Sequence, residues 1–322
     1  MSGSADPPDQ PDPGAVQGSV EGTWESDTPG SYELRVKITP ESPPAPADKP
    51  PAGKKTDKNL ILLCHAVVLA TILWMAACVF APPAFFPFTV QAQYLWIVTL
   101  AFFIADGVAI GYTMTGNAGG IFINERKLMS ISRAQVALWS LLILSAFFTI
   151  FVIRLRAGVA DPVNIGIDTQ LWAVMGISLG SLAGRTYIMG KKGNAQPKPE
   201  KFDRAVVQAG KALKESSSEI KDNAIGVLYA NKDTKNASLM DMFQGDEVGN
   251  TWLIDIGKIQ MFFFTIITII TYGAAIWALL LHTAIGSITA LPPLNDGFVA
   301  LLGISHAGLL ANSGTTVTPT ET

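Results

Sequence analysis

Ionisable side chains within apolar segments are the residues of this 322-residue chain best placed for chemistry. Asp106 lies near the middle of one apolar run, and His65, Arg185 and His306 lie in three others. A charged side chain at the centre of a bilayer costs at least about 2.5 to 3.5 kcal/mol on insertion scales, so each such residue is a functional hypothesis by default. Asp106 and His306 fall at overlapping predicted depths and could form a proton or cation relay. The competing interpretation is a neutral Asp106 that is hydrogen-bonded within a helical bundle, and the sequence leaves both open.

The motifs of soluble enzymes do not occur in a context that would make them work. The chain has no phosphate-binding loop, no His-Glu-x-x-His zinc motif and no Gly-x-Ser-x-Gly elbow between a strand and a helix. Asp241, Asp246, Glu247 and Asp255 form an acidic stretch, but their spacing does not match a calcium-binding loop. We therefore expect no catalytic residue, no cofactor and no metal site.

The composition is typical of an integral membrane protein. Charged residues make up 15% of the chain, hydrophobic residues make up 49%, and the formal net charge is −3. A charge this small, without a basic cluster interleaved with aromatics, argues against a nucleic-acid partner. A bilayer core needs roughly 20 apolar residues as helix. Six segments qualify as spans, the last of them short for a full crossing: 59–80, 94–115, 134–153, 169–189, 259–281 and 297–312.

Lysine and arginine mark one side of the predicted spans. They gather before the first span, between the second and third, and between the fourth and fifth, whereas loops 81–93 and 282–296 contain none. Only Arg154 and Arg156 depart from this pattern, between the third and fourth spans. Because cytoplasmic flanks carry the excess of positive charge, both termini are expected inside, in a multi-pass protein of a bacterial cytoplasmic membrane.

An internal duplication predicts how the spans are arranged. The segment Ser132–Val136 reappears as Gly257–Met261, and Gly-Ile-Ser follows in each copy, beginning at Gly176 and at Gly303. Each copy contains two spans, so both insert with the same orientation. The predicted fold is therefore an all-α membrane protein with six transmembrane helices. These form a first hairpin and two parallel repeat hairpins, at 59–115, 134–189 and 259–312.

Both repeats carry a row of small residues at four-residue spacing. The rows consist of Gly176, Gly180 and Gly184 in the first copy and of Gly303, Ala307 and Ala311 in the second. Small residues on one helix face allow close helix packing in lipid, and packing is the predicted role. A pore or substrate path lined by these residues is the alternative, and a homo-oligomer is left open.

The two repeats also begin alike, with a cation followed two residues later by a glutamine. Arg133 and Lys258 are expected to anchor helix depth through contact with lipid phosphate. Gln135 and Gln260 are expected to hydrogen-bond to another helix or to an interfacial group, with ligand contact as the alternative.

Three stretches of the chain resemble a group of bacterial integral membrane proteins. They are Ser130–Trp139 (SISRAQVALW), Met242–Asn250 (MFQGDEVGN) and Leu301–His306 (LLGISH). The resemblance covers approximately residues 94–312. It implies a multi-span membrane protein and carries no activity, because none is established for that group.

The regions outside the spans are expected to bind protein partners. Residues 1–58 hold eleven of the twenty prolines and predict a disordered cytoplasmic leader. Within it, Tyr32, Leu34, Val36 and Ile38 alternate with polar and charged residues as in a solitary strand, which would dock on a partner's sheet edge or stay transiently extended. The loop 190–258 and the tail 313–322 are also predicted to be cytoplasmic.

Two functions from different classes follow from these patterns. The first is a non-enzymatic anchor or scaffold in the lipid bilayer, which recruits a cytoplasmic protein complex through the leader and the loop 190–258. The second is a small ion or proton channel or transporter that uses Asp106 and His306. The large cytoplasmic regions and the few intramembrane charges favour the first.

Overall fold

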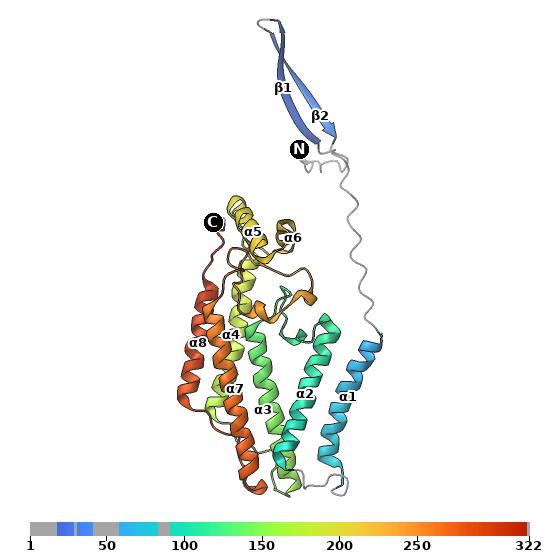
Figure 1. Ribbon diagram of the computed structural model, residues 1–322, viewed down its shortest axis with the longest axis vertical. Helices are drawn as coiled ribbons and strands as arrows, with labels where there is room; N and C mark the ends of the chain where they lie inside the picture. Colours follow the sequence, from blue (N-terminus) through green and yellow to red (C-terminus); the bar gives the residue numbers. More distant parts are fainter. Residues whose placement is uncertain (1–17, 29–30, 41–57, 83–90, 321–322) are drawn as a thin grey trace, which may run out of the picture. The chain divides into compact units, whose positions relative to one another are not determined.

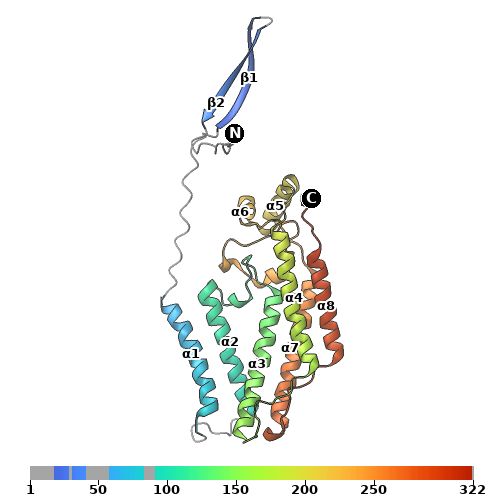
Figure 2. The same ribbon diagram turned by 180° about the vertical axis from the view of Figure 1, so that it is seen from behind.

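A computed structural model describes residues 18–28, 31–40, 58–82 and 91–320 (Figures 1 and 2). The chain divides into two compact units, Met1–Lys55 and Thr56–Thr322.

The first unit contains a β-hairpin. Strand β1 (Gly18–Thr28) pairs antiparallel with β2 (Ser31–Pro40), with Trp24 opposite Leu34. The alternating segment Tyr32 to Ile38 therefore lies in a strand, but this strand is not solitary. Its partner was missed because glycines and acidic residues interrupt the strand-favouring types of β1. The predicted disorder of the leader at 1–17 and 41–57 lies outside the described residues.

The second unit is a bundle of long helices. Six of them occur in the described part of the chain: α1 (Lys58–Phe80), α2 (Ala92–Thr115), α3 (Ile131–Arg156), α4 (Thr169–Gly193), α7 (Ile256–His282) and α8 (Asp296–Gly314). Five of these described helices are long and apolar enough to cross a membrane, and α4 is the exception. Arg185 and five glycines lower the hydropathy of α4. The structure thus corrects the count of six apolar spans to five, and the short α8 is among them.

The loops of the bundle gather at its two ends (Figure 1). Residues 116–130, 194–255 and 315–320 lie at one end and are called the cap here. Residues 157–168 and 283–295 lie at the other end. The loops predicted to share one side of a membrane therefore share one end of the bundle. Which end faces the cytoplasm stays a prediction.

The core of the bundle forms around α3. Trp139, Ala146 and Ile150 of this helix are at most 1% exposed, and the Trp139 ring lies 5.7 Å from that of Tyr272 on α7. Trp96 of α2 donates a hydrogen bond to Ser145 Oγ over 3.1 Å. Helix α1 is peripheral, because it packs mainly on α2 and leaves most of its apolar surface exposed.

The two arginines that depart from the charge pattern bind backbone carbonyl groups at the end opposite the cap. Arg154 is buried and donates to the carbonyl oxygens of Ile288 and Asp161, over 2.5 and 2.8 Å. Arg156 donates to the Cys78 carbonyl near the C-terminal end of α1, over 2.9 and 3.1 Å. Cations at such carbonyls are favourable. These contacts give Arg154 and Arg156 a structural reason to lie on this side.

Helices α4 and α8 form the most extensive helix pair of the bundle. A Cβ on Gly184 would lie 3.0 Å from Leu310, and one on Gly303 would lie 3.8 Å from Ile177, so these two glycines face the neighbouring helix. The other members of the small-residue rows are exposed, and they are Gly176, Gly180, Ala307 and Ala311. Helix packing within the chain therefore uses only part of each predicted row.

The cap has its own small core. Helices α5 (Pro199–Leu213) and α6 (Ser217–Asn223) pack Phe202, Val206 and Ile220 against Leu128 and Val248. The short helices η1 (Gly120–Phe122), η2 (Thr234–Asn236) and η3 (Leu239–Met242) complete the cap, and η4 (Ile285–Ser287) lies at the other end. The loop between the two repeats is thus a folded layer.

Candidate functional site

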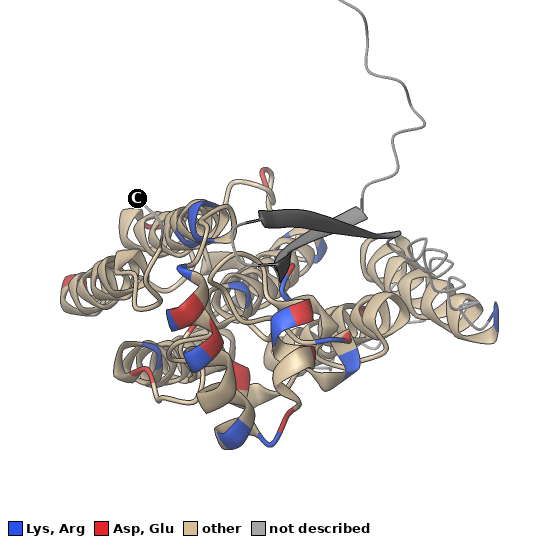
Figure 3. Ribbon diagram, turned by 90° about the horizontal axis from the view of Figure 1, so that it is seen from above, with Lys and Arg blue, Asp and Glu red and all other residues tan. Residues whose placement is uncertain are grey.

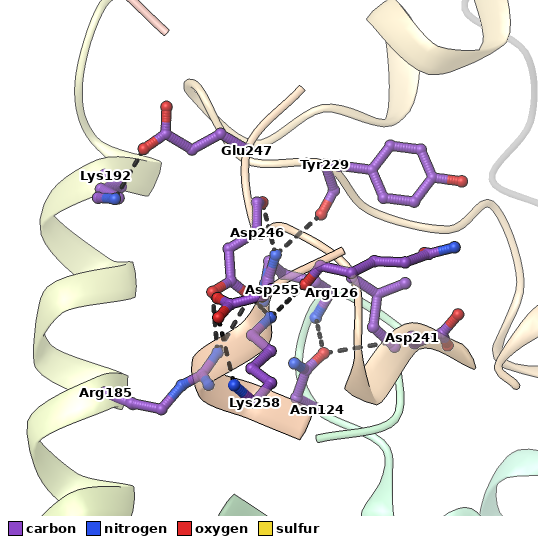
Figure 4. A network of polar contacts seen from close by, with 12 residues as sticks. Asn124, Arg126, Arg185, Lys192, Tyr229, Asp241, Asp246, Glu247, Asp255 and Lys258 are labelled. Atoms are coloured by element: carbon purple, nitrogen blue, oxygen red, sulfur yellow. Dashed lines mark hydrogen bonds and ion pairs between the residues drawn. The ribbon is translucent and has the colours of Figure 1, made fainter. Parts of the chain in front are cut away.

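A buried carboxylate with three cationic partners lies at the junction of the cap and the bundle. Asp246 accepts from Arg126 Nη2 over 2.6 Å, from Arg185 Nη2 over 3.0 Å and from Lys258 Nζ over 3.0 Å (Figure 4). The three cations come from the loop after α2, from α4 and from the first turn of α7. Asp246 therefore ties three separate segments to one point.

The electrostatics of this cluster follow from its burial. Burial alone raises the pKa of Asp246, but Arg185, Lys258 and Arg126 outweigh it and hold the pKa well below its ordinary value. Each of the four side chains is at most 10% exposed. Removing one partner of a buried ion pair leaves an uncompensated charge and costs about 3 to 5 kcal/mol. Asp246 is thus the residue on which the junction depends most.

The adjacent residue, Glu247, binds the segment 315–320 that follows α8. These contacts, together with those of Lys192, are called the brace here. Its carboxylate accepts from Lys192 Nζ over 2.7 Å and from the backbone N–H groups of Val317 and Thr318 over 2.9 and 2.5 Å. Lys192 also donates to the Thr315 carbonyl over 2.5 Å. Glu247 is 1% exposed, so this brace is closed to water.

The remaining acidic residues of the stretch cap local structure. Asp241 accepts from the backbone N–H groups of Ser238 and Met129 over 2.9 and 3.1 Å, and burial raises its pKa. Asp255 accepts from the backbone N–H of Lys258 and starts α7. Within the described residues no group of three or more His, Cys, Asp or Glu side chains could hold a metal ion.

The four polar residues predicted inside the membrane do not form one site. Asp106 accepts from Thr71 Oγ1 of α1 over 3.0 Å, and His65 Nδ1 lies 2.7 Å from the Ile61 carbonyl of its own helix. His306 lies 2.7 Å from Gln135, and Arg185 belongs to the Asp246 cluster. Helices α2 and α8 lie on opposite sides of α3 and α7 in both views (Figures 1 and 2). The structure therefore does not bring Asp106 and His306 together.

The cation and the glutamine at the start of α3 differ in their surroundings from those at the start of α7. Gln135 is fully buried and bonds to His306 of α8 through the two Nε2 atoms, whereas Gln260 is exposed. Arg133 is about one third exposed and contacts the Ile123 carbonyl and Glu125. Lys258 is 2% exposed and donates to Asp246 and to the Gln244 carbonyl. Lys258 thus holds the cap, which differs from the expected contact with lipid phosphate.

Buried polar atoms without a partner occur in the helices around Gln135. On one face of α3 they include Ser132 Oγ and Trp139 Nε1, and on α8 they include Ser305 Oγ and His306 Nδ1. Buried polar groups without partners are uncommon in folded proteins.

The Gly176–Gly180 pentapeptide also matches the letters Gly-x-Ser-x-Gly, but it lies within α4 and Ser178 donates to the Val174 carbonyl. No nucleophile elbow exists there.

Sequence reasoning identified the acidic stretch and Lys258 but not the cluster that they form. In the sequence Asp246 is one of four residues in an acidic stretch, and Arg126 is one of the positive charges between the second and third predicted spans. Arg185 and Lys258 could have indicated the cluster. Both are cations in or next to apolar spans, and a buried cation needs a counter-charge.

Seen from the cap end, residues of both charge signs are interspersed along the ribbon of the cap (Figure 3). A scan against protein-family models finds no match, and searches of the curated proteins and of the solved structures find none either. What is established is a chain with candidate membrane spans, whose charged cap is tied to the bundle by Asp246 and Glu247.

Proposed function

We propose that the protein is a non-enzymatic anchor in a bacterial cytoplasmic membrane, where its cap and leader recruit a cytoplasmic protein. The observation that carries this proposal is the concentration of buried ion pairs at the junction of the cap and the bundle. Asp246 pairs with Arg126, Arg185 and Lys258, and Glu247 pairs with Lys192, with every side chain at most 10% exposed. These pairs fix a folded layer to the helix ends. A fixed surface binds a partner without an ordering cost at the moment of binding.

The outer face of the cap supports docking. Helix α5 buries Phe202 and Val206 and turns Lys201, Asp203 and Arg204 toward solvent. Charges of both signs on one exposed face favour a partner with the complementary pattern, because charge complementarity sets specificity and association rate.

The hairpin of the leader is a second docking element. Among the described residues β1 and β2 pair only with each other, so each strand has one outer edge without a partner. A two-stranded hairpin is marginally stable in water by itself. A third strand from a partner would extend the sheet and stabilise it through backbone hydrogen bonds.

The alternative, a small channel or transporter, has less support. A relay through Asp106 and His306 requires the two side chains to exchange a proton or an ion. However, Asp106 bonds to Thr71 and His306 bonds to Gln135, so the two do not contact each other. The unpartnered polar atoms around Gln135 are the one observation in its favour.

Crosslinking in native membranes, followed by purification of the full-length protein, tests the proposal. A soluble partner in stoichiometric amount is expected with the wild type. It should be lost when residues 31–40 are replaced by a Gly/Ser segment of equal length, and kept when residues 1–10 are replaced in the same way. Failure to recover a soluble partner, together with proton or cation flux in liposomes that Asp106→Asn abolishes, would reject the anchor.

A further inference from the structure

A cavity of about 300 Å³ lies beside the Asp246 cluster, at the cap end of α4. Its polar wall includes Arg126, Arg133 and Arg185, with Glu125 beside Arg133, and its apolar wall includes Leu182 and Met189. The three arginines reach it from the loop after α2, from the start of α3 and from α4. A cavity lined by three guanidinium groups is suited to an anion.

The charges around the cavity are not balanced. Arg126, Arg133, Arg185 and Lys258 carry four positive charges, against which the adjoining ion pairs set only Glu125 and Asp246. Asp241, in the neighbouring pocket, adds a third carboxylate that attracts Arg126 through space, although its hydrogen bonds come from Ser238 and Met129. One positive charge therefore remains in excess. Uncompensated positive charge in a site withdrawn from water is unfavourable. A bound anion would remove that cost.

One of the guanidinium groups has a free donor. Arg185 makes both of its bonds to Asp246 through Nη2, and its buried Nη1 has no hydrogen-bond partner. The side chain is 9% exposed, so bulk water does not satisfy it. Arg133 is the adaptable member of the set, because its partner Glu125 is 70% exposed and exposed ion pairs contribute only about 0 to 1 kcal/mol.

We propose that this cavity binds a phosphate-bearing anion, held by Arg133 and by the unpartnered Nη1 of Arg185. Arg126 adds positive charge, since its Nη1 and Nη2 already donate to Tyr229 and Asp246. The planar guanidinium group donates two parallel hydrogen bonds to phosphate oxygens, which fits this ligand better than a single halide ion. The phosphate belongs either to the headgroup of an anionic lipid or to a soluble phosphate compound. The site is separate from the docking elements of the anchor and does not depend on that function.

The surroundings of the cavity explain why a lipid is a fitting source. Leu182 and Met189 continue the cavity wall along α4, and Leu179 and Tyr187 of the same helix are 52% and 65% exposed. An acyl chain lying on this surface would place its phosphate at the cap end of α4. Basic pockets between transmembrane helices are known to bind such headgroups.

Two variants test the site without touching Asp246. Arg133→Gln removes the exposed cation. Gly190→Leu adds a large side chain at a residue that lines the cavity, where a Cβ meets no atom within 4 Å. Arg204→Gln on α5 is the matched control, because its ion pair with Glu200 is exposed.

Full-length protein is reconstituted in phosphatidylcholine nanodiscs for two measurements. The first counts phosphatidylglycerol retained by the protein in native mass spectrometry, as the fraction of that lipid rises. The second follows the melting temperature in pure phosphatidylcholine as inorganic phosphate is added. Saturable binding in either measurement supports the proposal, and the measurement that responds identifies the source.

Arg133→Gln and Gly190→Leu should each weaken the binding by about tenfold or more, the equivalent of about 1.4 kcal/mol. Arg204→Gln should bind like the wild type. Absence of saturable binding in both measurements would overturn the proposal. Equal binding by the wild type and by both cavity variants would overturn it as well.

Discussion

Two carboxylates in different regions of the molecule have very different surroundings. Asp106, between α2 and the peripheral α1, has a single neutral partner, Thr71. Asp246, in the cap, has three cationic partners on three segments. A lone acceptor with one hydroxyl partner changes the stability of the fold little, whereas a carboxylate shared by three cations is a structural centre. In the part of the chain that the structure describes, the buried ion pairs thus lie toward the cap end of the helices, away from the middle of the spans.

The largest difference between the two regions is expected from alanine substitution of each carboxylate. Asp246→Ala leaves three buried cations without their counter-charge and should cost about 3 to 5 kcal/mol. Hydrogen exchange of the full-length protein in nanodiscs should show loss of protection across residues 224–255. Asp106→Ala is the control and should leave that protection unchanged. Equal effects of the two substitutions would break the comparison.

A smaller effect is expected at the neighbouring brace. Glu247→Ala removes the acceptor for Lys192 and for two backbone N–H groups of the tail. It leaves one buried cation without its counter-charge, whereas Asp246→Ala leaves three. The tail after Gly314 should become sensitive to protease. Glu215→Ala, which removes an exposed acceptor of the Tyr229 hydroxyl, should not release the tail. A tail that stays protected in Glu247→Ala would contradict the role given to this brace.

The Gln135 and His306 pair should behave as a coupled unit. Gln135→Leu removes the partner of His306 Nε2 and should destabilise the bundle by about 1 to 3 kcal/mol, the cost of an unsatisfied buried polar group. The double variant Gln135→Leu with His306→Leu removes both polar groups and should recover much of that loss. Thermal unfolding in detergent measures both. Strict additivity of the two substitutions would mean that the pair is not coupled.

Asp106→Asn should have a smaller effect still. The amide keeps an acceptor for Thr71, so the change in stability should stay below about 1.5 kcal/mol. Flux of protons or cations in liposomes should equal that of the wild type. Abolished flux in this variant would restore the relay hypothesis.

Acid titration should have the least effect of all near neutral pH. The pKa of Asp246 is lower in the folded state than in the unfolded chain, so the unfolded chain binds more protons at acidic pH. The contribution of Asp246 is complete above the ordinary Asp pKa of about 3.9 and is lost as the pH falls toward the lower folded value. Hydrogen exchange of the cap, corrected for its intrinsic pH dependence, should therefore show that the contribution of Asp246 is constant from about pH 7 to about pH 5. Cap opening within that range would contradict the assigned pairing.

The sequence predicted the features that depend on local composition and failed where contacts are distant. Apolar length was enough to locate α1, α2, α3, α7 and α8 as candidate spans. The loop charges grouped the cap segments on one side, and Gln135 was expected to bond to another helix, as it does. The partners of Asp246 could not be predicted, because Arg126 lies 120 residues away and Arg185 looked like a residue within a span. The strand pair of the leader was missed, since β1 lacks the regular alternation of β2.

The most direct test of the anchoring role is photo-crosslinking from defined positions in native membranes. A photoreactive residue is placed at Val207 on α5 in the cap, which is 45% exposed, and at Leu179 on α4 in the bundle, which is 52% exposed. The account predicts one soluble protein crosslinked in stoichiometric amount from Val207, and only lipid or membrane protein from Leu179. Absence of a soluble adduct from Val207, with proton or cation flux that depends on Asp106, would contradict it.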